Sequence, residues 1–134
     1  MKGIENIIVN LNQWQKALNN FKIAIIKNPS EIERDGAIQR FEYNFELAWK
    51  TLKTVLEYLG VEDCKSPRKA LQSALINNYI STDDEWIWVK MMEDRNRVAH
   101  TYNEHTAEEL YAEFPIYYEK MELVLKNLIN EFKK

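Results

Sequence analysis

Eight consecutive residues, from Arg95 to Tyr102, form the densest group in this chain of side chains that suit acid–base or phosphate chemistry. They include two arginines, an asparagine, a histidine, a threonine and a tyrosine. A neutral imidazole such as that of His100 accepts or donates a proton near neutral pH. A guanidinium binds a phosphate through two parallel hydrogen bonds and stabilises charge that develops on it. Together these are the groups needed to cleave RNA without a metal ion.

The spacing within this segment decides which of its side chains can meet. On a continuous helix, Arg95 and His100 lie about 140° apart around the axis. Both reach one phosphate only if the helix ends between them or if a second copy of the chain supplies one of them. Arg97 and His100 lie about 60° apart, so Arg97 is the closer neighbour if the helix continues. His100 and Tyr102 share a side if the chain is extended there.

The same residue types also allow a purely structural interpretation. Arg95 would then pair on the surface with a glutamate such as Glu93 or Glu42, and His100 would cap the end of a helix. Other chemistry is not indicated. No cluster of cysteine and histidine has the spacing of zinc ligands, and no glycine-rich phosphate loop is present, so we expect neither a metal ion nor a cofactor.

The elements that position this segment are predicted to be helices, because apolar residues recur along the chain at helical spacing. A stripe with a seven-residue repeat predicts a first helix from residue 4 to near Lys27. The pair Asn28-Pro29 ends it, since the residue before a proline is pushed out of the helical region. Ser30 and Glu33 then form a capping-box pattern, which opens a second long helix.

Three further helices are predicted after these two. The fourth helix of the chain carries Trp86, Val89 and Met92 and runs into the Arg95 segment. In the last helix, Pro115 predicts a kink or a restart. The signals that begin or end these helices are, in chain order, Gly60, Ser66-Pro67, the segment from Ser81 to Asp84, and a Thr106/Glu109 capping box.

Composition places the chain among all-α proteins with one domain. It is 46% apolar, with only three glycines and three prolines, which favours an up-down bundle of about five helices over a many-stranded sheet. We expect residues 1–134 to form a single domain. The net charge of −3 argues against non-specific electrostatic binding of the chain to nucleic acid. No signal peptide or membrane helix is indicated, so a cytoplasmic location is expected.

The string from Arg95 to Tyr102 resembles the R-x4-H-x-Y signature of HEPN-superfamily proteins. Upstream, residues 38–50 (Ile-Gln-Arg-Phe-Glu-Tyr-Asn-Phe-Glu-Leu-Ala-Trp-Lys) resemble the second helix of one branch of that superfamily. That branch is the nucleotidyltransferase substrate-binding protein family. The similarity covers residues 4–130, nearly the whole chain.

The resemblance implies a HEPN-like helical bundle that forms a homodimer and brings two R-x4-H segments to a shared cleft. Such proteins are typically encoded beside a minimal nucleotidyltransferase and form a complex with it. In toxin–antitoxin members the HEPN subunit is a metal-independent ribonuclease, which the partner silences by attaching adenylate to the motif tyrosine. By this resemblance Arg95 holds the scissile phosphate, His100 serves in acid–base catalysis, Tyr102 accepts adenylate, and Asn96 and Arg97 support the site.

Two functions follow as expectations. In the first, the chain is the accessory or substrate subunit of a two-component nucleotidyltransferase system and binds nucleotide or accepts adenylate on Tyr102. The alternative is a HEPN endoribonuclease toxin that uses Arg95 and His100 on RNA and is silenced by its partner. A third class, a helical dimer without chemistry, predicts that these three residues point away from any cleft.

Overall fold

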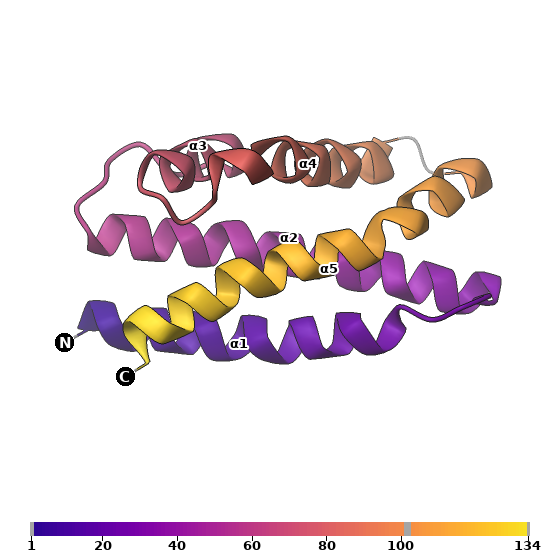
Figure 1. Ribbon diagram of the computed structural model, residues 1–134, viewed down its shortest axis with the longest axis horizontal. Helices are drawn as coiled ribbons and strands as arrows, with labels where there is room; N and C mark the ends of the chain where they lie inside the picture. The colour runs from indigo at the N-terminus through magenta and orange to yellow at the C-terminus, as the bar shows by residue number, and fades with distance from the viewer. Residues whose placement is uncertain (1, 101–102, 134) are drawn as a thin grey trace.

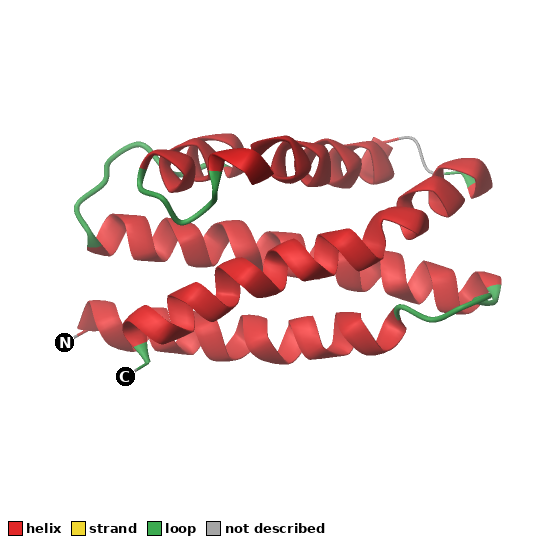
Figure 2. Ribbon diagram, in the orientation of Figure 1, coloured by secondary structure: helices red, strands yellow, loops and turns green. Residues whose placement is uncertain are grey.

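The structure, a computed structural model, describes residues 2–100 and 103–133. Over these residues all regular secondary structure is helical, as Figure 2 shows. The predicted all-α bundle of five helices is confirmed, and a homodimer stays a prediction. The elements are α1 (Lys2–Ala24), α2 (Glu31–Tyr58), α3 (Pro67–Ile76), a 3-10 turn (Thr82–Asp84), α4 (Glu85–His100) and α5 (Glu104–Phe132).

Helix α2 is the central element of the bundle, because it packs against each of the other four α-helices. Figure 1 shows α3 and α4 along one side of α2 and α1 along the other, while α5 runs obliquely across α2 from beside the end of α4 to beside the start of α1. The end of α4, the start of α5 and the α1–α2 connection lie at one end of the bundle, and both chain termini lie at the opposite end (Figure 1). The Arg95 segment is therefore at the end that is remote from the termini. No helix in the described ranges is long and apolar enough to cross a membrane.

Helix α1 ends at Ala24, earlier than the predicted end near Lys27. The reason is a tertiary contact. The Tyr111 hydroxyl of α5 accepts a hydrogen bond from the backbone N–H of Ile26 and donates to the Ile26 carbonyl, both at 2.8 Å. The Tyr111 hydroxyl thus pairs with backbone groups just beyond the end of α1, where intrahelical partners run out.

The start of α2 follows the predicted capping box. The Ser30 hydroxyl accepts from the backbone N–H of Glu33 at 3.1 Å, and the Glu33 carboxylate accepts from the backbone N–H of Ser30 at 2.9 Å. The predicted stop at Gly60 also holds, because its φ of 87° lies in the left-handed region that favours glycine. Ser66 and Pro67 open α3 as predicted.

The predicted Thr106/Glu109 capping box is wrong. Asn103 is the N-cap of α5, and its side-chain oxygen accepts from the backbone N–H of Thr106 at 3.0 Å. Asparagine caps at least as well as threonine, and this earlier start buries Thr106 in the first turn. The helix continues without a break through Pro115, so no restart occurs there.

The predicted apolar stripe of α4 is only partly right. Met92 is buried and Val89 is half-buried, but Trp86 is 61% exposed. The helix is rotated so that another set of side chains meets α2 and α5. The residues of α4 that face the core are Ile87, Trp88, Met91 and Met92.

A cluster of four buried rings joins α1, α2 and α5. The Phe114 ring lies 5.0 Å from that of Phe21 and 5.3 Å from that of Phe41, measured between centroids. Tyr117 lies 5.4 Å from Phe41. All four rings are fully buried, so this cluster is the centre of the core and places the Tyr117 hydroxyl next to α4.

Candidate functional site

The two arginines of the motif point to different sides of α4. Two residues apart on a helix, they are separated by about 160° around the axis. The Arg95 guanidinium donates to the Glu46 carboxylate of α2. The same carboxylate receives the Trp49 indole N–H at 3.3 Å and lies 3.4 Å from the Lys50 ammonium. Arg95 is therefore held against α2 by an acid that is itself anchored.

The structural interpretation was right that Arg95 pairs with a glutamate, but the partner is Glu46 rather than Glu93 or Glu42. Glu42 lies one helical turn before Glu46 on the same face of α2. Burial raises the pKa of the Glu42 carboxyl above its usual value, and the positive charge of Arg95 opposes that rise. Glu93 is exposed on the surface.

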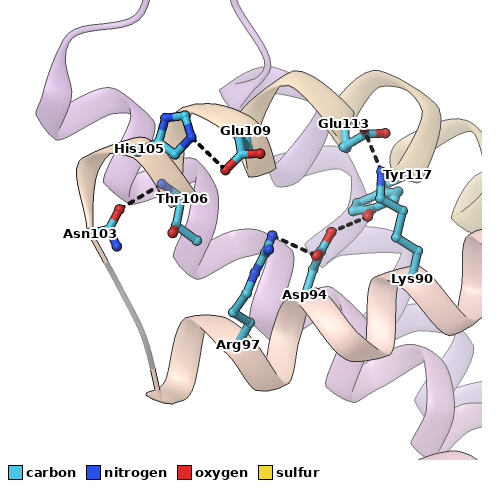
Figure 3. Close-up of polar contacts among 9 residues, drawn as sticks. All are labelled: Lys90, Asp94, Arg97, Asn103, His105, Thr106, Glu109, Glu113 and Tyr117. Atoms are coloured by element: carbon cyan, nitrogen blue, oxygen red, sulfur yellow. Dashed lines mark hydrogen bonds and ion pairs between the residues drawn. The ribbon is translucent and has the colours of Figure 1, made fainter.

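Arg97 lies on the α5 side of α4, at one end of a chain of hydrogen bonds that runs through Asp94 to Tyr117 (Figure 3). We call these three hydrogen-bonded side chains the relay. Its guanidinium donates to the Asp94 carboxylate at 3.1 Å, and the Tyr117 hydroxyl of α5 donates to the other oxygen of that carboxylate. The Asp94 side chain is only 9% exposed. Burial, together with the hydrogen bond to Asp94, raises the pKa of Tyr117 far above that of an ordinary phenol. Tyr117 therefore stays protonated and acts as a donor.

An acidic cleft of about 340 Å³ lies between α4 and α5 beside this relay. Figure 3 shows the facing side chains, among which Lys90 pairs with Glu113 at 2.8 Å and His105 with Glu109 at 3.3 Å. The cleft does not favour an anion, because four carboxylates outnumber two cations along its walls. Within residues 2–100 and 103–133 no group of three or more potential ligands is placed to hold a metal ion. The lining residues are Lys90, Glu93, Asp94, Arg97, Glu109 and Glu113.

The other predicted site residues are only partly placed. Asn96 lies exposed on α4, and His100 is the last residue of that helix. The side chain of His100, and the whole of Tyr102, lie outside the described residues. The structure thus brings Arg95 to α2 and Arg97 to α5, and it does not bring the two guanidiniums together.

Sequence reasoning missed three residues that hold the motif: Glu46, Asp94 and Tyr117. Asp94 carried a usable signal, since it follows Met91 by three positions and so continues the core-facing stripe of α4. A carboxylate on such a stripe indicates a buried polar contact. Glu46 had no comparable signal, because its partner lies 49 residues away in sequence.

The stability of the protein is expected to fall as the pH rises above about 10, the ordinary pKa of a phenol. The pKa values of Tyr79 and Tyr117 are raised, and partial burial together with the hydrogen bond to Glu122 raises the pKa of Tyr118 to about 12. Above the ordinary pKa the unfolded chain releases these protons while the folded chain keeps them, so folding loses stability. For the buried Tyr117 the loss approaches about 1.4 kcal/mol per pH unit.

Denaturant unfolding from neutral to strongly alkaline pH measures this slope. The Tyr117→Phe variant removes one titrating group and is expected to give a shallower decline above pH 10. Identical slopes for the two proteins would show that Tyr117 does not control alkaline stability.

Comparison with known proteins agrees with the geometry, which defines an all-helical bundle with a charged motif at the end of its fourth helix. A family model described as "Nucleotidyltransferase substrate binding protein like" matches residues 9–130. The chain therefore belongs to the nucleotidyltransferase substrate-binding protein family. A crystal structure of a protein from Thermus thermophilus is similar, with a TM-score of 0.80 and 38% sequence identity over 86% of this chain and 98% of that chain. No curated protein matches the sequence.

Proposed function

We propose that this protein is the accessory subunit of a two-component, toxin–antitoxin-like system, in which a minimal nucleotidyltransferase encoded nearby is its partner. The observation that carries the proposal is the family match, which spans the whole segment from Arg95 to Tyr102 and whose description refers to a nucleotidyltransferase. In this role the chain, as a single HEPN-like domain and a homodimer, binds nucleotide or accepts adenylate on Tyr102. On either side of Tyr102, Ala99 and residues 103–105 are exposed, and they lie at the end of the bundle remote from the termini, which suits a site that another protein must reach (Figure 1).

The modification is a nucleotidyl transfer to a phenol. The Tyr102 oxygen attacks the α-phosphorus of ATP held by the partner, so an O–P bond forms and the bond from the α-phosphorus to the bridging oxygen breaks. Pyrophosphate leaves with that bond's electron pair, and the phenolic proton passes to a base or to solvent. In this scheme His100, two residues away, is the candidate base within the chain.

The charges around the motif favour this accessory role over cleavage of RNA. Arg95 is already bound by Glu46, and Arg97 is bound by Asp94. A phosphate that approaches either guanidinium therefore meets the negative charge of a carboxylate already bound there.

The alternative function, a metal-independent ribonuclease that uses Arg95 and His100, is supported by one observation. The Arg95 side chain remains 31% exposed although it is paired, so a substrate phosphate can approach it from solvent. Such a phosphate would replace Glu46 as the partner of the guanidinium, and Asn96 and Arg97 would support the site. Incubation of tRNA or mRNA with the wild type and with an Arg95→Ala/His100→Ala variant tests this function, which requires cleavage by the wild type alone.

Co-expression with the nucleotidyltransferase tests the primary proposal. A stable complex is expected on size-exclusion chromatography, and with ATP the intact mass of the chain is expected to increase by one adenylate. The Tyr102→Phe variant is expected to enter the complex without gaining that mass, whereas the Tyr118→Phe control gains it. Two separate elution peaks, or equal modification of the Tyr102→Phe variant, would contradict the proposal.

A further inference from the structure

A second cleft, of about 290 Å³, lies on the opposite side of α2 from α3 and α4, along the seam between α1 and α2. Gln13, Lys16, Ala17 and Asn20 of α1 form one wall, and Tyr43 of α2 forms the other. We call this cleft the Tyr43 groove. Tyr43 is 57% exposed, so its ring is presented to solvent rather than to the core.

The polar groups of the Tyr43 groove are available to a ligand. Among the described residues, the Tyr43 hydroxyl and the side chains of Gln13, Lys16 and Asn20 have no hydrogen-bond or ion-pair partner. Unlike the acidic cleft between α4 and α5, this groove has no carboxylate among its lining residues. An aromatic ring, an ammonium and two carboxamides are the groups that stack a base, hold a phosphate and read a base edge.

A guanidinium extends the groove at the end nearer the motif. Arg40 precedes Tyr43 by three positions on α2, so the two side chains share a face of that helix. The Arg40 guanidinium donates to the backbone carbonyl of Asn20 at 2.9 Å, and this bond fixes it across the seam. Its remaining N–H groups stay available to an anion. Lys16 and Arg40 thus place a cation on each wall beside the Tyr43 ring.

The Tyr43 groove is also close to the motif through α2. Tyr43 and Glu46 are three residues apart and lie on neighbouring parts of the helix surface. Glu46 is the residue that binds Arg95. A ligand on Tyr43 therefore lies within one helical turn of the carboxylate that holds the motif arginine.

We propose that the Tyr43 groove binds a nucleotide unit, either free or within single-stranded RNA. The base stacks on Tyr43, its edge meets the carboxamides of Gln13 and Asn20, and the phosphate binds Lys16 or Arg40. This inference deepens the proposed function and rests on it in one respect, because it assumes that a nucleotide handled by the motif is also held beside it.

The test measures binding of a fluorescently labelled oligoadenylate to the purified chain by anisotropy, with AMP and ribose 5-phosphate as competitors. The Tyr43→Ala variant is expected to bind at least about five-fold more weakly, since removing an aromatic stacking partner has effects of that size or larger. The Tyr43→Phe variant keeps the ring and is expected to bind like the wild type. The Lys16→Gln variant is expected to bind more weakly and with a shallower salt dependence. The Trp86→Ala variant removes a similarly exposed aromatic ring elsewhere, 61% exposed against 57% for Tyr43, and serves as the matched control.

The competitors separate the two sources of the nucleotide. Strong competition by AMP indicates a free nucleotide, and weak competition by AMP with tight oligoadenylate binding indicates a strand. Competition by ribose 5-phosphate equal to that by AMP would overturn the stacking role of Tyr43. The proposal is also overturned if the wild type binds neither the oligoadenylate nor AMP. It is overturned as well if the Tyr43→Ala variant binds as tightly as the wild type, or if that variant differs from the wild type only in its oligomeric state on sedimentation.

The two proposals can fail separately. The binding assay contains no partner protein and does not score Tyr102. Co-expression and adenylate transfer can therefore fail while the Tyr43 groove binds nucleotide, and the reverse outcome is equally visible.

Discussion

Replacing Phe114 with alanine is expected to lower the free energy of unfolding by about 3–5 kcal/mol. Phe114 is fully buried, and its ring packs on those of Phe21 and Phe41. The substitution removes the transfer free energy of the ring and leaves a cavity where α1, α2 and α5 meet. Because the surrounding helices are long and packed on several sides, they can close that cavity only in part.

Denaturant unfolding of the Phe114→Ala variant at neutral pH measures this loss. Ile32→Ala is a suitable control, since Ile32 is 84% exposed at the start of α2 and its replacement is expected to change stability by less than about 0.5 kcal/mol. A loss below about 1 kcal/mol in the Phe114→Ala variant would mean that the ring cluster is not the centre of the core, because even a well-relaxed site loses more than that.

Replacing Asp94 with alanine is expected to lower the free energy of unfolding by about 3 kcal/mol, the next largest effect. The substitution removes the acceptor for the buried Tyr117 hydroxyl, and hydrogen bonds to charged groups contribute about 1.5–3 kcal/mol each. The orphaned donor adds a desolvation cost of about 1–3 kcal/mol. The contact with Arg97 adds less, since that side chain is 47% exposed and its pairing is screened by water.

A double-mutant cycle separates the relay from a general packing effect. The Asp94→Ala/Tyr117→Phe variant is expected to be clearly more stable than the sum of the two single changes predicts, because it leaves no buried hydroxyl without a partner. Purely additive losses would show that the hydrogen bond from Tyr117 to Asp94 contributes nothing to folding. The Asp94→Asn variant retains an oxygen acceptor and is expected to lose less stability than Asp94→Ala.

Much of the fold could be predicted, because the signals were local. Apolar residues at helical spacing identified the helices, and the Ser30–Glu33 capping box and Gly60 marked the two ends of α2. The errors had two sources. At the end of α1 a tertiary contact, from the Tyr111 hydroxyl, holds the backbone at Ile26. At the start of α5 two local signals competed, and Asn103 rather than Thr106 caps the helix.

The candidate site was predictable only in its composition. The segment from Arg95 to Tyr102 was identified from residue types and spacing, and the family match includes it. The angular separation of Arg95 and Arg97 also follows from helix geometry. The two arginines differ in how far away in sequence their partners lie. Asp94 is three residues from Arg97, within reach of a local pattern, whereas Glu46 is 49 residues from Arg95.

By itself, the sequence determined that this protein is a helical bundle and that one short segment gathers arginines, a histidine and a tyrosine, the residue types that suit phosphate and acid–base chemistry. Both properties depend on periodicity and on neighbours within one or two helical turns. Only the tertiary structure decided that Arg95 is held by Glu46 and that the Tyr117 hydroxyl, 23 residues from Asp94, supports the other arginine. Such pairings depend on the rotation of each helix about its axis when it packs, which no repeat in the sequence of a single helix specifies.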